Sequence, residues 1–93
     1  MDRHEALAVL RGELQRYRER SYADLVAILR APTSIESTGP SGIRYQVEIQ
    51  VFWDGPKGQN IRVMGSVDDG GRRAFSPLSE SFIMSPTGTF IGE

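Results

Sequence analysis

The chain has 93 residues, which is enough for one domain. Its formal net charge of −1 produces no strong electrostatic field of either sign. Nucleic acid and anionic membranes attract basic surfaces, so neither is expected as a partner. The absence of cysteine excludes disulfides, thiolate catalysis and cysteine-ligated zinc. We expect a single domain over residues 1–93 that needs no metal or cofactor.

The first residues do not have the character of a targeting segment. Arg3, His4, Glu5 and Arg11 interrupt the apolar stretch that a signal peptide requires. No apolar run approaches the length of a membrane span. We therefore expect a soluble protein in the cytoplasm.

Residues 2–19 have the periodicity of an amphipathic helix. Asp2 followed by Glu5 forms a capping-box pattern at its start. Apolar residues recur at spacings of three and four and form one stripe, at Leu7, Leu10, Leu14 and Tyr17. The sequence predicts that this stripe is buried.

A second capping signal, Ser21 followed by Asp24, interrupts the helical region. It favours a short second helix over residues 22–29, although one long kinked helix fits the same apolar spacing. Pro32 ends either arrangement, because it lacks an amide proton and restricts the residue before it.

The stretch 43–53 is the strongest pattern in the chain. Its apolar side chains occupy alternate positions, at Ile43, Tyr45, Val47, Ile49, Val51 and Trp53. Alternation in β-branched and aromatic residues predicts a strand with one buried face and one wet face. We expect this strand to be central, with neighbours on both sides.

Further strands are predicted at 33–38, at 61–68, at 73–75 with a continuation at 81–84, and at 89–91. The turns between them are rich in residues that tolerate unusual backbone angles. Pro77 interrupts the third of these strands, since it cannot donate a ladder hydrogen bond. Helices followed by strands predict an α+β fold, with one or two N-terminal helices packed on one face of a four- to five-stranded antiparallel meander sheet.

The turn at 54–60 aligns two predicted strands if it closes a hairpin. Phe52 then lies opposite Arg62, and Gln50 opposite Met64, with Glu48 next along the same face. This face points away from the helices, so these five residues form a candidate homodimer or ligand surface. The alternative is a solvated face that carries two isolated apolar side chains, which is common.

A second candidate site lies at a charged turn. Asp68, Asp69, Arg72 and Arg73 follow one another closely, and Trp53 could form a wall beside them. Carboxylates and guanidiniums in this arrangement suit a small ligand or an anion. The alternative is turn chemistry, in which Asp accepts hydrogen bonds from its own turn and Arg neutralises the acids. The alternating acids of an EF-hand are absent.

No catalytic constellation emerges from the sequence. His4 is the only histidine, and no partner for it can be identified. The serines have neither a nucleophile elbow nor a nearby base. The sequence therefore favours a protein that is not an enzyme.

Two stretches resemble small uncharacterised bacterial proteins, namely YQVEIQVFWD at 45–54 and SVDDGGRRAFSPL at 66–78. The resemblance implies a compact domain without an assigned activity, and it transfers no site residue. The order of helix and sheet is also similar to cystatin-type and nuclear-transport-factor-like folds. The chain is short for the deep pocket of the latter, and fold alone does not determine function.

These observations lead to three hypotheses about function. The first is a non-catalytic binding or assembly domain that self-associates through the open sheet face or an edge strand. The second is a small-ligand or anion site at the 68–73 turn, which would allow a weak enzyme. The third is an inhibitor or immunity-type protein that binds another protein.

Overall fold

The computed structural model describes residues 2–70 and 78–93, and two helices open the chain. Helix α1 (Arg3–Arg18) begins after Asp2, whose side chain accepts a hydrogen bond from the Glu5 amide at 3.0 Å. Helix α2 (Tyr22–Ala27) begins after Ser21, which caps the Asp24 amide at 3.1 Å. The prediction of two helices is confirmed. The single kinked helix is wrong, because Ser21 has extended backbone angles.

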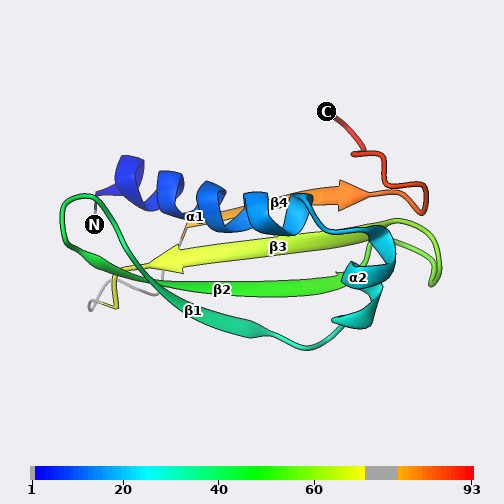
Figure 1. Ribbon diagram of the computed structural model, residues 1–93, viewed down its shortest axis with the longest axis horizontal. Helices are drawn as coiled ribbons and strands as arrows, with labels where there is room; N and C mark the ends of the chain where they lie inside the picture. The colour runs from blue at the N-terminus through cyan, green and yellow to red at the C-terminus, as the bar shows by residue number, and fades with distance from the viewer. Residues whose placement is uncertain (1, 71–77) are drawn as a thin grey trace.

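Four antiparallel strands follow in the described part of the chain: β1 (Thr33–Thr38), β2 (Arg44–Trp53), β3 (Ile61–Asp68) and β4 (Leu78–Met84). They lie side by side in chain order, so the sheet is a meander with β2 between β1 and β3 (Figure 1). The predicted strand at 73–75 and its interruption at Pro77 lie outside the described residues. Residues 89–91, predicted as a strand, form only one bridge, between Met84 and Phe90.

The β2–β3 register is the one that a hairpin at 54–60 requires. Phe52 lies opposite Arg62, and Gln50 lies opposite Met64. The turn is closed by a hydrogen bond of 2.9 Å from the Asp54 amide to the Asn60 carbonyl. Since side chains alternate between faces, this register also decides which residues are buried.

Helix α1 lies along one face of the sheet (Figure 1). The core between the two layers contains Ala6, Leu10, Leu14, Tyr17, Leu25, Tyr45, Val47, Ile49, Val51, Ile61, Val63, Val67, Phe82 and Met84. The predicted fold class is therefore confirmed: an α+β arrangement with its helical layer on one side of an antiparallel sheet.

Three side chains from the predicted stripes are less buried than expected. Leu7 is half-buried because the contact line of α1 runs through Ala6 instead, one residue earlier. Ile43 is 41% exposed, and Trp53 is half-buried. A 16-residue helix spans roughly 24 Å and a 10-residue strand roughly 33 Å, so the ends of β2 extend beyond the helix.

Gly65, in the middle of β3, allows α1 to approach the sheet closely. A Cβ atom at this position would lie 2.7 Å from Leu10 Cδ1, 3.1 Å from Ile49 Cδ1 and 3.2 Å from Leu14 Cδ2. The space that a side chain would occupy is therefore filled by α1. Gly65 is therefore a point of close contact between the helical layer and the sheet.

Glu5 connects the start of α1 to the β1–β2 hairpin, whose turn curves around the N-terminal end of the helix (Figure 1). One Glu5 oxygen accepts from the Ser41 amide at 2.9 Å, and the other accepts from the Ser41 hydroxyl at 2.6 Å and the Tyr45 hydroxyl at 2.7 Å. Gly39 leaves room for the carboxylate, since a Cβ there would lie 2.8 Å from Glu5 Cδ. The hydrogen bonds from Ser41 and Tyr45 lower the pKa of Glu5, and the bond to Glu5 raises the pKa of Tyr45 to about 12.

Replacement of Gly65 by alanine is expected to destabilise the fold by about 1–3 kcal/mol, because the new methyl group overpacks the contact with Leu10. The matched control is Gly12→Ala, on the exposed side of α1, where a Cβ meets nothing within 4 Å. That change should stabilise the protein by about 0.5–1 kcal/mol. Urea denaturation measures both. Equal stability of the two variants would show that α1 does not pack against Gly65.

Replacement of Glu5 by glutamine is expected to lower stability at neutral pH and to have less effect in acid. The pKa of folded Glu5 lies below its ordinary value of 4.5, so its contribution is present above pH 4.5 and is lost as the pH falls through the folded-state pKa. The denaturation midpoints of both proteins, measured across this range, should converge at low pH. Glu48→Gln is the control, since the Glu48 side chain is exposed and makes no hydrogen bond or ion pair with the described residues. A Glu5→Gln deficit that does not change with pH would contradict this role.

Candidate functional site: the open face of the sheet

The sheet face opposite α1 is uncovered in the described structure, and we call it the open face. Burial alternates along β2, with exposed residues between buried ones from Arg44 to Gln50. The open face comprises Ser34, Glu36, Thr38, Arg44, Gln46, Glu48, Gln50, Phe52, Arg62, Met64, Ser66, Asp68, Ser79, Ser81 and Ile83. Thus all five residues predicted as an interface lie on one surface.

Three apolar side chains gather at one end of the open face. Phe52 and Ile83 both lie opposite Arg62, one on each side, and Met64 is two residues along from Arg62. Directly opposite residues have Cβ atoms about 5 Å apart and diagonal ones about 7–8 Å, so Met64 lies near both Phe52 and Ile83. Phe52 and Ile83 are two strands apart, roughly 10 Å, with Arg62 between them. Each of the three is half-buried. We call this group the apolar cluster.

Ile83 was missed by the sequence analysis. Its face depends on the β3–β4 register, and no short turn in the sequence specified that register. Phe82, Ile83 and Met84 are consecutive apolar residues, so the sequence shows no alternation there; in the structure Phe82 and Met84 are both 2% exposed. Two buried neighbours place the residue between them on the opposite face.

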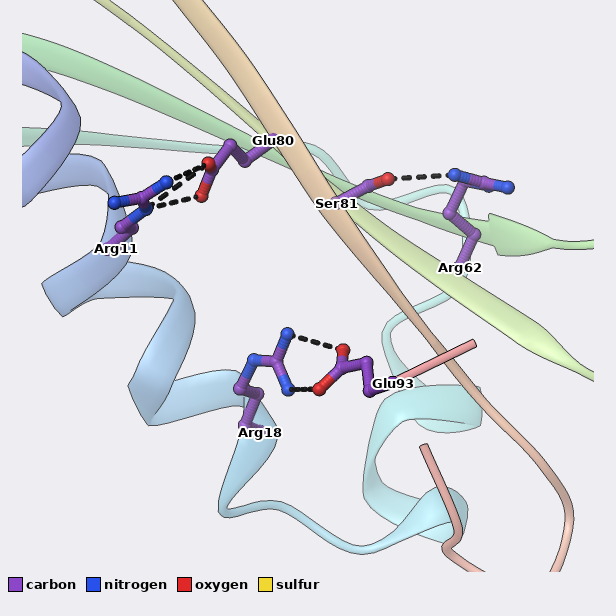
Figure 2. Close-up of polar contacts among 6 residues, drawn as sticks. All are labelled: Arg11, Arg18, Arg62, Glu80, Ser81 and Glu93. Carbon is purple, nitrogen blue, oxygen red and sulfur yellow. Dashed lines mark hydrogen bonds and ion pairs between the residues drawn. The ribbon is translucent and has the colours of Figure 1, made fainter. Parts of the chain in front are cut away.

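Arg62 is held in place at the centre of the apolar cluster. Its Nε lies 3.1 Å from Asp54 Oδ1, and its Nη1 donates to Ser81 Oγ at 2.7 Å. Figure 2 shows the bond to Ser81, on the side of β4 away from Glu80. Since the ion pair is about one-third exposed, its main effect is to orient the guanidinium, and it adds little stability.

The middle of the open face forms a shallow depression. Its volume is about 260 Å³, and it is lined by Glu48, Gln50, Met64, Ser66 and Ser79. This lining holds one carboxylate and no second acid or base, so it lacks the pair of groups needed for acid–base catalysis. Within residues 2–70 and 78–93, no three His, Asp or Glu side chains are grouped as metal ligands.

On the other side of the sheet, two ion pairs hold the secondary-structure elements together (Figure 2). Arg11 of α1 binds Glu80 of β4 at 2.7 Å, and Arg18 binds Glu93 at 2.6 Å. The hydrogen bonds to these arginines lower the pKa values of Glu80 and Glu93. The Arg18 guanidinium also lies 4.9 Å from the centre of the Phe82 ring. These groups hold the helix and the C-terminal segment against the sheet.

The second predicted site is not assembled as expected. Asp68 is opposite Gln46, whereas Trp53 is opposite Ile61 near the other end of β2. Trp53 is seven positions along β2 from Gln46, roughly 23 Å, so Trp53 cannot form a wall beside the 68–73 turn. The cause is the antiparallel register, which places the two ends of β2 far apart.

The described residues of that turn agree with the alternative prediction, in which an aspartate side chain accepts a hydrogen bond from the backbone of its own turn. Asp68 Oδ1 accepts a hydrogen bond of 2.7 Å from the Gly70 amide, and Gly70 has a φ of 73°. Asp69 is half-buried beside it. Arg72 and Arg73 lie outside the described residues. The Asp68 carboxylate therefore already takes part in shaping the turn.

No family model, curated protein or solved structure matched this chain. Neither α1 nor α2, the helices of the described residues, is long and apolar enough to cross a membrane. The assignment of the open face as a candidate site is therefore based on its geometry alone.

Proposed function

We propose that this protein is a non-catalytic assembly domain that self-associates through the open face. The observation that carries the proposal is the apolar cluster of Phe52, Met64 and Ile83, on the sheet face opposite α1. In a two-layer domain the second sheet face is free to pack against another sheet. A second copy of the chain brings an identical cluster.

The charges of the open face are compatible with pairing to itself. The face carries Arg44 and Arg62 together with Glu36, Glu48 and Asp68. In a two-fold dimer each surface meets its own copy, so a face with both signs can place arginine against carboxylate. A face of one sign would repel its partner.

The area available predicts a weak or transient dimer. The four strands contain 6, 10, 8 and 7 residues. With about 3.3 Å per residue and about 4.8 Å between strands, they cover on the order of 500 Å². Two such faces bury roughly 1,000 Å², which is the lower limit for a specific interface.

The edges of the sheet are less suitable than its face. The outer edge of β4 is partly occupied, because Met84 bridges to Phe90 and the Ile91 amide donates to the Ile83 carbonyl at 2.9 Å. Strand β1 is only six residues long, and Glu36 lies within it. Short, charged edges of this kind discourage strand addition.

Replacement of Phe52 by aspartate is expected to abolish self-association. Light scattering should show wild-type protein rising toward twice the chain mass as its concentration approaches high micromolar. The variant should keep the monomer mass, since a charge would enter the apolar cluster. Circular dichroism checks that the variant is folded.

The matched control for this experiment is Ile43→Asp. Ile43 is 41% exposed and lies next to β2, on the face that α1 covers, so its replacement should leave the wild-type dimerisation unchanged. A wild-type protein that remains monomeric at high micromolar concentration would overturn the proposal.

A further inference from the structure

β1 separates from β2 before β2 ends, and this leaves part of the β2 edge without a strand partner. The β1–β2 register stops at Thr33 and Ile49, whereas β2 continues to Trp53. On the vacated edge the Arg30 amide donates to the Val51 carbonyl at 3.1 Å. In an antiparallel strand the N–H and C=O of one residue point to the same edge, so the Val51 N–H also lies there.

Arg30 has an unusual backbone conformation at this position. Its φ is 59°, and it is the one non-glycine residue with positive φ in the described chain. A side chain in the left-handed region is unfavourable compared with glycine, and such residues concentrate at functional sites. The turn therefore holds an arginine where glycine would fit better.

The Arg30 side chain is also unpaired. Arg11, Arg18 and Arg62 each bind a carboxylate, and Arg20 lies over the Tyr17 ring. Arg30 makes no side-chain hydrogen bond, ion pair or ring contact with residues 2–70 or 78–93. Its planar guanidinium, which matches the geometry of a carboxylate, is available to a ligand.

A cavity of about 370 Å³ opens beside Arg30 and is lined by Arg30, Pro32, Gln50, Val51 and Phe52. This volume is near the lower limit of small-molecule sites. The lining has one cation, no carboxylate, one side-chain amide and apolar surface from Pro32 and Phe52, whereas the Val51 side chain is 3% exposed and belongs to the core. Apolar walls beside a single positive charge suit a monoanion with an apolar group.

We propose that this cavity binds a small organic carboxylate that carries an aromatic or aliphatic group. The carboxylate pairs with the Arg30 guanidinium, and the apolar group packs against Phe52 and Pro32. Arg30 and Pro32 lie outside the open face, so the inference goes beyond self-association. The site is complete in one protomer.

The test is a titration of ¹⁵N-labelled protein with 3-phenylpropionate, followed by amide chemical shifts. The expected result is saturable shifts at residues 30–31 and 50–52. The neutral analogue 3-phenylpropanamide should bind about tenfold more weakly or worse, because it lacks the charge that pairs with Arg30.

Arg30→Gly separates binding from folding. Glycine accepts a φ of 59°, so the melting temperature should stay the same or rise while affinity for the acid falls about tenfold or more. Arg16→Gln is the matched control, since it removes one exposed arginine from α1 but leaves the cavity and the open face intact. It should bind the acid as the wild type does.

Three results would overturn the inference. They are the absence of saturable shifts in the low-millimolar range, equal affinity for acid and amide, or equal affinity of Arg30→Gly and wild type. Because Phe52 and Gln50 belong to both the cavity and the open face, the titration is done at a protein concentration at which light scattering gives the monomer mass, so its failure would not bear on self-association.

Discussion

The structure depends on the contact between α1 and Gly65. Leu10 is fully buried and occupies the space that a side chain on β3 would fill. Side chains that interdigitate at this distance give the density of a well-packed interior. The contact also determines which face of the sheet is closed, since a single helix of this length covers only one side. The open face is a direct consequence.

Polar interactions reinforce this arrangement at its margins. Glu5 ties the β1–β2 turn to the start of α1, and Arg18 ties the last residue to its end. Both are exposed or partly exposed, so they orient segments more than they stabilise them. The apolar contact provides most of the stability, and the ion pairs reduce the number of ways in which the ends of the chain can lie.

The open face and the Arg30 cavity share Phe52 and Gln50 but differ in character. The open face is broad and mixed in charge, which suits a second protein surface. The cavity is small, has one cation and lies where β1 departs from β2. The departure follows from Pro32, which lacks an amide proton for the ladder, and from the turn at residues 28–30 that ends α2.

The sequence by itself determined the central strand and the β2–β3 register, and it favoured two helices over one kinked helix. These rest on local signals: two capping residues, a period of two over ten residues, and one hairpin turn. Five predicted interface residues follow from that register. Only the tertiary structure decided that Leu7 lies at the margin of the core, that Ile83 joins the open face, that Trp53 is far from Asp68, and that Arg30 borders a cavity. Each of these depends on contacts between segments distant along the chain, or on the residue at which one strand leaves another. Hydrophobic periodicity and helix-capping residues are local patterns, and they do not specify those contacts.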